Sequence, residues 1–212
     1  MTEQIKITME ALEKNRMKPF YAETKEDVMP IIKSIIGKGE SVAVGGSVTL
    51  DQIGAIEEFR NGDYAFIDRY KEEITLEERK KLFRDAFFAD NFVTSSNAVT
   101  QNGELVNVDG NANRVAALLY GPEKVIVVVG ANKIVENTAK GFERIRKIAA
   151  PKNVKRLGCE TYCAVKGECK GDGNIGSGCL SEKRICCDYV VSSFQRFKDR
   201  IKVIICAEEL GY

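Results

Sequence analysis

Six of the seven cysteines lie within residues 158–188, and the chain contains no histidine. Thiolates are soft ligands that suit both tetrahedral zinc and iron–sulfur clusters. The missing histidines exclude Ser-His and Cys-His nucleophiles as well as histidine metal ligands. Any chemistry must therefore use carboxylates, lysine, tyrosine, thiolates or a cofactor. For the cysteines themselves, a four-iron four-sulfur cluster, structural zinc, and free thiols or a redox disulfide all remain open.

A second polar segment, residues 95–114, is dense in short amides and turn residues. Such composition between apolar runs predicts loops that present polar groups. Its candidate binding residues are Asn97, Asp109, Asn111 and Arg114. Asp109 is either a general acid or base or a turn former. Arg114 either clamps a carboxylate or phosphate in bidentate fashion or forms an ion pair with Asp109 that fixes the loop.

A glycine-rich turn follows the strand expected at residues 41–44. It contains four candidate anion-binding residues, Gly45, Gly46, Ser47 and Thr49. Free backbone N–H groups at a helix start favour an anion, and glycine lets a ligand approach closely. Thr49 and Gln52 have the spacing of a capping box for the following helix. The alternative is an ordinary tight turn between a strand and a helix.

The elements that position these segments alternate between strands and helices. Strands are expected at residues 20–22, 41–44, 87–94, 98–100, 105–108, 125–129 and 203–206. Helices are expected at residues 3–16, 24–36, 49–60, 75–86, 115–120 and 134–149. This order predicts an α/β fold with a mostly parallel sheet flanked by helices. Ligands of such sheets bind beyond the carboxyl ends of the strands, where the turn at residues 45–49 and the loop at residues 130–133 should lie.

Four further residues have two readings each. Lys133 either supplies charge at the end of the strongest strand or is solvated at a helix start. Glu208 and Glu209 either line a pocket or cap the last strand. Cys206, within that strand, is expected to be a buried apolar residue and no ligand.

Composition excludes several classes of protein. The formal net charge is +1 and the isoelectric point is near 7.5, so we expect no nucleic-acid or membrane-surface partner. No apolar run approaches the length of a bilayer span, and the first 16 residues, charged and amphipathic, are unlike a secretory signal. We therefore expect a cytoplasmic protein whose clustered cysteines serve metal or redox chemistry. No nucleotide cofactor is assigned.

Residues 94–135, the turn at 45–50 and the last ten residues together resemble the LUD domain, a family of lactate-utilisation proteins. The resemblance covers essentially the whole chain, which we expect to form a single domain over residues 1–212. It implies the fold shared by glucosamine-6-phosphate deaminase, ribose-5-phosphate isomerase and the CoA transferases, with a cysteine-rich loop insertion at residues 158–188. In those relatives the glycine-rich turn holds phosphate or carboxylate groups of the substrate.

The cysteine pattern is similar to one in LUD proteins of anaerobes. Residue by residue, that similarity selects Cys163, Cys169, Cys179 and Cys186 as metal ligands, with Cys159 and Cys187 as spares. An insertion at residues 170–178 widens the middle gap of the pattern, so the ligand set differs from the family's in spacing. The chain lacks the paired ferredoxin-type motifs of the larger lactate-oxidation subunit, so electron transfer does not simply carry over.

Two functions follow from the residues and the resemblance. The first is a protein that binds a small anionic metabolite, a hydroxy acid such as lactate or a sugar phosphate, and that carries a cysteine-ligated metal. The second is a non-catalytic accessory or electron-transfer subunit that uses the cysteines toward a redox partner protein. Neither the substrate, nor catalysis, nor the oligomeric state follows from the sequence.

Overall fold

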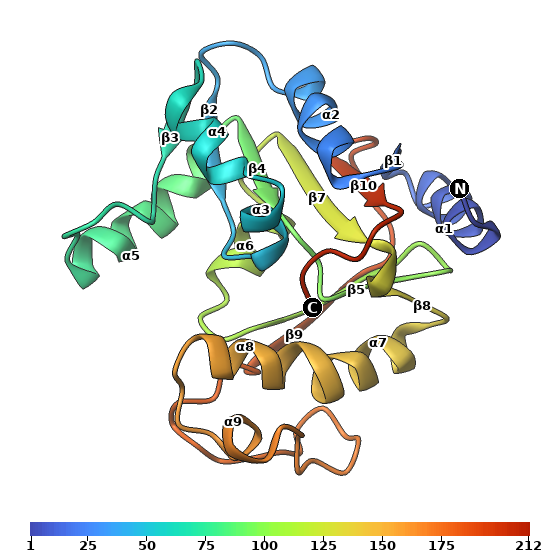
Figure 1. The fold of residues 1–212 in the computed structure, drawn as a ribbon, viewed down its shortest axis with the longest axis vertical. Coiled ribbons are helices and arrows are strands. Elements are labelled where there is room, and N and C mark those ends of the chain that lie inside the picture. Colours follow the sequence, from blue (N-terminus) through green and yellow to red (C-terminus); the bar gives the residue numbers. More distant parts are fainter.

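The computed structural model describes all 212 residues, and its largest feature is a six-stranded parallel sheet (Figure 1). The strands are arranged in the order β1-β10-β7-β4-β2-β3. Their bounds are β1 Lys18–Ala22, β2 Ser41–Val44, β3 Ala65–Ile67, β4 Asn91–Thr94, β7 Lys124–Gly130 and β10 Ile201–Cys206. This confirms the predicted α/β class with a mostly parallel sheet.

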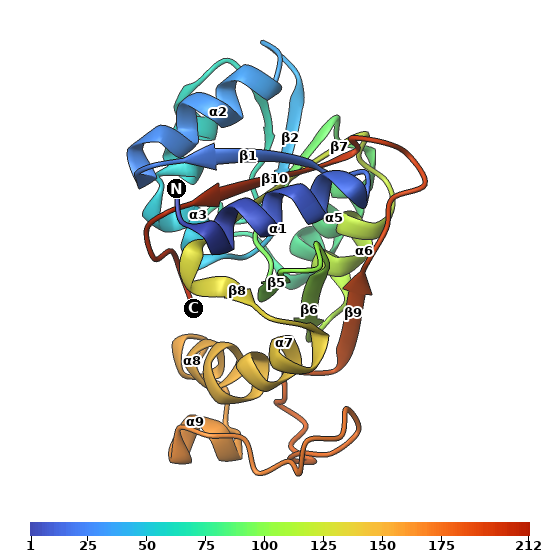
Figure 2. The ribbon, with the colours of Figure 1, turned by 90° about the vertical axis from the view of Figure 1, so that its right-hand side faces the viewer.

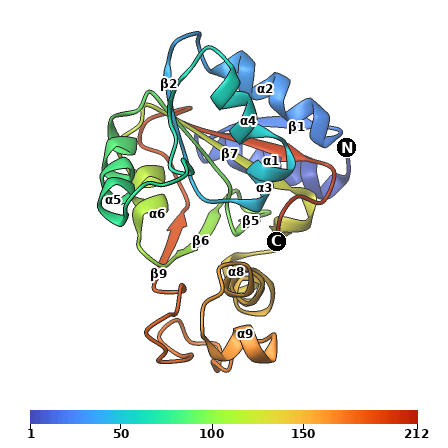
Figure 3. The same cartoon turned by 60° about the vertical axis from the view of Figure 1, so that its left-hand side comes forward.

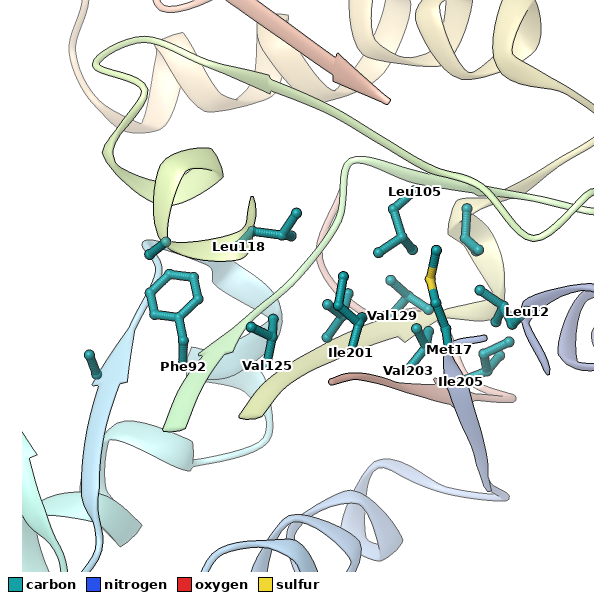
Figure 4. Packing of buried hydrophobic residues seen from close by; sticks show 14 of the residues in the cluster. Leu12, Met17, Phe92, Leu105, Leu118, Val125, Val129, Ile201, Val203 and Ile205 are labelled. Atoms are coloured by element: carbon teal, nitrogen blue, oxygen red, sulfur yellow. The ribbon is translucent and has the colours of Figure 1, made fainter. Parts of the chain in front are cut away.

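Both faces of this sheet are buried, which explains the continuous apolar runs of its central strands. Alternate residues of β7 point to opposite sides: Val125, Val127 and Val129 belong to one core, and Ile126 and Val128 to the other. Figure 4 shows the first of these cores, in which strand residues pack against side chains from α1 and α6. The sheet is therefore the middle layer of the molecule.

The helices are distributed over the two faces and one end of the sheet. Their bounds are α1 Glu3–Lys14, α2 Val28–Ile35, α3 Val48–Gln52, α4 Ala55–Asn61, α5 Leu76–Asp85, α6 Asn113–Leu119, α7 Thr138–Arg144, α8 Ala150–Arg156 and α9 Tyr162–Lys166. Buried residues of α2, α3 and α4 pack on one face, and those of α1 and α6 pack on the other. No helix is both long and apolar enough to cross a lipid bilayer.

A second, four-stranded sheet lies against the α1 and α6 face, in the order β8-β5-β6-β9. Its strands are β5 Ala98–Thr100, β6 Leu105–Asp109, β8 Ile134–Val135 and β9 Asp188–Ser192. The other face of this small sheet packs against Ile145 and Ala150, so α7 and α8 lie beyond it (Figure 2). A π-helical turn at Ile145–Ala149 joins α7 to α8.

Most expected elements are confirmed, including the strands at residues 98–100 and 105–108, which pair as β5 and β6, and the helix that begins after Thr75. The capping box at Thr49 is wrong: α3 begins at Val48, after Ser47, whose side chain makes no capping hydrogen bond. The helix expected at residues 134–149 begins only at Thr138. Ile134 and its neighbour instead pair with β5, and Asn137 caps the helix through the N–H of Lys140.

The segment at residues 158–188 contains one short helix, α9, and no helix or strand between residues 167 and 187. It ends in β9, which pairs with β6 in antiparallel register and was not expected from the sequence. The cysteine-rich segment is therefore attached to the rest of the chain by a strand of the small sheet.

The chain changes direction across the large sheet between β2 and β4. From β2 the chain continues through α3 and α4 to the edge strand β3, whereas β4 pairs with the other side of β2. In α/β proteins the crevice at such a point, beyond the carboxyl ends of the strands, is where ligands bind. The C-terminus lies close to this edge, between the sheet and α8 (Figure 3).

A substitution in the turn between β5 and β6 can test how closely the small sheet packs against α1. Gly103 has φ +77°, and a Cβ there would lie 2.5 to 2.6 Å from backbone atoms of Ala11 and Leu12. Gly39 has a similar φ of +73° and open space around it. We expect Gly39→Ala to lower the free energy of unfolding by about 1–2 kcal/mol through backbone strain alone. Gly103→Ala should lose roughly 1–3 kcal/mol more through the clash. Equal losses in urea titrations would contradict this packing.

Candidate functional site

A cavity of about 200 Å³ opens at the carboxyl edge of the large sheet. Its floor comes from the residues that follow β2, β4 and β7, which are the strand ends on either side of the change in direction. The loop between β6 and α6, the helix α8 and the last two residues of the chain form its walls. The cavity thus lies where the fold class places ligands.

Seven of the eight predicted binding residues line this cavity. They are Gly46, Ser47, Thr49, Asn97, Asp109, Asn111 and Arg114. Gly45 does not line it: its backbone packs so closely that a Cβ would lie 3.0 Å from Cγ of Arg114. The structure therefore brings the two predicted segments together, and Gly45 permits their contact.

The guanidinium of Arg114 is committed to the loops around it. Its Nη1 donates to the carbonyl of Ser95 (3.0 Å) and to Oδ1 of Asn107 (2.7 Å). Its Nη2 donates to Oδ1 of Asn97 (3.2 Å) and to the carbonyl of Val108 (2.8 Å). A ligand clamp at Arg114 would require these hydrogen bonds to break, so the fixing of the loops is its evident role.

Asp109 pairs with Arg114, as one of the two predictions for Arg114 had it. Its Oδ2 lies 3.4 Å from Nε of Arg114 and accepts no hydrogen bond, and both side chains are nearly buried, with exposed fractions of 10% and 12%. Its Oδ1 accepts the N–H of Asn111 at 3.2 Å, as in a turn. The same carboxylate therefore forms the turn and neutralises the arginine.

Lys133 is buried, with 3% of its surface exposed, and its reading as a solvated lysine is wrong. Its Nζ lies 2.8 Å from Oγ1 of Thr49 and 3.0 Å from Oγ of Ser95, and it has no carboxylate partner. Burial, together with the charges of Arg144 and Arg114, lowers the pKa of Lys133 to about 7. In the sequence, only the position of Lys133 shortly after the strongest strand indicated that it could lie at the ligand-binding edge of the sheet.

Arg69 also lines the cavity and was missed by the sequence analysis. It follows β3, a strand too short and too weakly patterned to be expected. Its guanidinium lies over the rings of Phe83 (4.5 Å) and Tyr70 (5.5 Å) and makes no hydrogen bond or ion pair. Burial lowers the pKa of Arg69, which nevertheless stays charged because arginine titrates so high. Arg69 is thus a cation with unused donors.

The outer wall adds another unpaired cation. Arg156 of α8 donates to Oδ1 of Asn153 and, from Nε, to the hydroxyl of Tyr212 at 2.9 Å. Neither Glu208 nor Glu209 lines the cavity, and Oε2 of Glu208 accepts the backbone N–H of Lys25. The charged lining therefore consists of Arg69, Arg114, Lys133 and Arg156 against the single carboxylate Asp109. This excess of positive charge suits an anionic ligand.

A second, small cavity lies under the cysteine-rich segment. Its lining contains four thiols, those of Cys163, Cys169, Cys179 and Cys186, with Arg146 and Lys170. Cys159 and Cys187 do not line it, and Cys206 is buried in the core of the large sheet. Burial, followed by the neighbouring thiols, raises the pKa of Cys163, while a hydrogen bond to Thr161 opposes this.

The four thiols suit a soft metal in their chemistry. Zinc and four-iron clusters each take four sulfur ligands, and a thiolate set of that size carries negative charge that Arg146 and Lys170 would offset. Their spacing does not yet complete such a site, because no group of three or more ligand side chains is arranged to hold a metal ion. All seven cysteines are free thiols.

The cysteine segment also forms part of the wall of the first cavity. The N–H of Cys187 donates to the carbonyl of Asp109 at 3.0 Å, and Ile185 lines the cavity beside Gly110. A Cβ on Gly110 would lie 3.1 Å from Cα of Ile185. The two cavities are therefore neighbours that share a wall.

Comparison with protein families decides the relationship that the motifs indicated. The LUD domain model matches residues 5–206. The chain belongs to the LUD domain family. That family is linked to lactate utilisation, and the match spans the cysteine-rich segment of this LUD protein and every lining residue of the sheet-edge cavity except Gly211 and Tyr212. No curated protein matches the sequence significantly.

One solved structure shares the fold of this LUD protein, and two others are more distantly similar. A DUF162 family protein from Deinococcus radiodurans is similar over 97% of each chain, with 15% identity and a TM-score of 0.53. Ribose 5-phosphate isomerase A from Methanocaldococcus jannaschii covers 92% of this chain and 80% of its own, with 15% identity and a TM-score of 0.37. The eIF2B beta subunit from Chaetomium thermophilum covers 57% and 42%, with 18% identity and a TM-score of 0.38.

The uncompensated amine of Lys133 should be visible in the stability of the protein. We expect Lys133→Met to raise the free energy of unfolding at pH 7, because a buried cation without a counterion is costly. The pKa of Lys133 is about 7 when folded and 10.5 ordinarily, so the cost to the wild type is complete below pH 7 and disappears as pH rises toward 10.5. The gain should therefore shrink between about pH 7 and pH 9.

Denaturant titrations at several pH values measure this difference. Lys152→Met, at an exposed position on α8, is the matched control and should show no such trend. A gain that is independent of pH would contradict the assignment of the amine as uncompensated.

Proposed function

We propose that the cavity at the sheet edge binds a small anionic metabolite, a hydroxy acid such as lactate or a sugar phosphate. The observation that carries this is the charge of its lining, in which three arginines stand against one side-chain carboxylate that is already paired. A volume of about 200 Å³ suits a ligand of a few heavy atoms. The link of the family to lactate utilisation supports the same class.

Arg69 is the residue that would recognise the anionic group. Its guanidinium is held by two aromatic rings but donates to nothing, so its planar donors are available to a carboxylate or phosphate. The guanidinium of Arg114, in contrast, already donates hydrogen bonds to the surrounding loops.

Thermal shift measurements with lactate, glycolate and sugar phosphates test this proposal. We expect at least one of these anions to raise the melting temperature of the wild type, because a ligand that binds only the folded state stabilises it. Arg69→Ala should weaken that ligand by about 10-fold or more, the size expected for a lost charge-assisted hydrogen bond. Arg79→Ala, exposed on α5, is the matched control. No response of the wild type to any of these anions would contradict the proposal.

We propose further that the cysteine-rich segment binds a metal through Cys163, Cys169, Cys179 and Cys186, as zinc or a four-iron four-sulfur cluster. The supporting observation is that these four thiols line one cavity while the remaining three do not. Such a site would hold together a stretch, residues 167–187, that has no regular secondary structure of its own. A cluster, in place of zinc, would give the protein a redox group for a partner protein.

Metal analysis after purification without oxygen tests the second proposal. We expect a stoichiometric metal in the wild type, brown if it is a cluster and colourless if it is zinc. Serine in place of any of the four lining cysteines should abolish stoichiometric binding, because serine oxygen is a poor ligand for these soft metals. Cys187→Ser, at an exposed position outside the cavity, should retain it. Equal loss in both kinds of variant, or metal-free wild type, would count against this ligand set.

A further inference from the structure

The buried amine of Lys133 has a property that anion binding does not require, because it is shielded from water and has no counterion. It is enclosed, it lines the cavity, and no carboxylate neutralises it. The one lining carboxylate, Asp109, faces Arg114. A lysine that served only as an anion anchor would need no shielding from water, because a charged ammonium is the form that attracts anions. Burial instead favours the free amine.

Two hydroxyls are placed to handle protons at this amine. Oγ1 of Thr49 is 2.8 Å from Nζ, and Oγ of Ser95 is 3.0 Å away on the loop after β4. Both residues line the same cavity as the amine. The C-terminal tail covers this group: a Cβ on Gly211 would lie 3.0 Å from Nζ. Desolvated lysines of this kind are nucleophiles toward carbonyl carbon.

We propose that Lys133 forms an imine with a small oxo anion, a 2-oxo acid or the open-chain form of a sugar phosphate, whose anionic group Arg69 binds. This rests on the proposed anion-binding function and narrows its ligand to compounds with a carbonyl group. Lactate itself could not form this imine, because it has a hydroxyl and a carboxylate but no ketone or aldehyde group.

The step requires no oxidant or reductant. The lone pair of Nζ attacks the carbonyl carbon, and the π electrons of the C=O bond pass to its oxygen, which takes up a proton. The nitrogen loses a proton to give a neutral carbinolamine. Its hydroxyl then takes up a second proton, which comes from solvent, and leaves as water while the nitrogen lone pair forms the C=N bond. Thr49 and Ser95 carry protons between nitrogen and oxygen. One proton is taken up overall, and it gives the protonated imine its positive charge.

Reductive trapping measures this bond directly. The full chain is incubated near neutral pH with pyruvate, glyoxylate or ribose 5-phosphate, and borohydride is then added. We expect one stable adduct per chain by intact mass, and peptide mapping should place it at Lys133. Lys133→Met should give no adduct, and Lys152→Met, at an exposed position on α8, should give the wild-type amount.

Two further variants keep the test informative. Ser95→Ala retains the amine and should slow trapping by roughly 10-fold or more, as for the loss of one proton-transfer group. Arg69→Ala should raise the concentration of oxo anion needed for half-maximal trapping. Adducts spread over several exposed lysines, or an equal yield from Lys133→Met, would overturn the proposal.

The outcome is separable from that of the parent proposal. If an oxo anion raises the melting temperature of the wild type but leaves no adduct at Lys133, the imine is refuted and anion binding stands. If no anion binds and no adduct forms, both are refuted.

Discussion

The hydrogen bonds of the Arg114 guanidinium join the two sheets beside the cavity. They connect the loop after β4, through Ser95 and Asn97, with the end of β6, through Asn107 and Val108. β4 belongs to the large sheet and β6 to the small one. A single, nearly buried side chain therefore connects the two sheets, with Asp109 as its counter-charge. Backbone carbonyls accept two of its bonds, so their positions depend on this cation.

The parallel sheet decides where polar chemistry can occur. Because both faces are covered, its strands offer mostly apolar side chains, and polar groups collect where the strands end. Lys133, Thr49 and Ser95 come from three different strand ends and meet at one point. An amine, two hydroxyls and an arginine with unused donors thus share a small volume whose only carboxylate is already engaged.

Much of this was visible in the sequence, for identifiable reasons. Continuous apolar runs such as Val125–Val129 located the sheet, and the glycine-rich turn together with the amide-rich segment located seven lining residues of the cavity. The small sheet was only partly visible, because β8 has two residues and β9 follows an irregular segment. Arg69 and Arg156 carry no local signal, since only tertiary packing brings them to the cavity. Burial of Lys133 likewise depends on the tail at Gly211, which lies 78 positions away in sequence.

The π-helical turn at Ile145–Ala149 lets the continuous helical segment from α7 to α8 present side chains to both cavities. Its wider turn admits an additional residue and so changes the register of the side chains that follow. Arg144, just before it, donates to the carbonyls of Asn97 and Asn132 beside the first cavity. Arg146, within it, lines the cysteine cavity and donates to the carbonyl of Asn174. Removing one residue from this turn would rotate Arg146 about the helix axis relative to Arg144. The π-helical turn therefore determines that Arg144 points toward the first cavity and Arg146 toward the cysteine cavity.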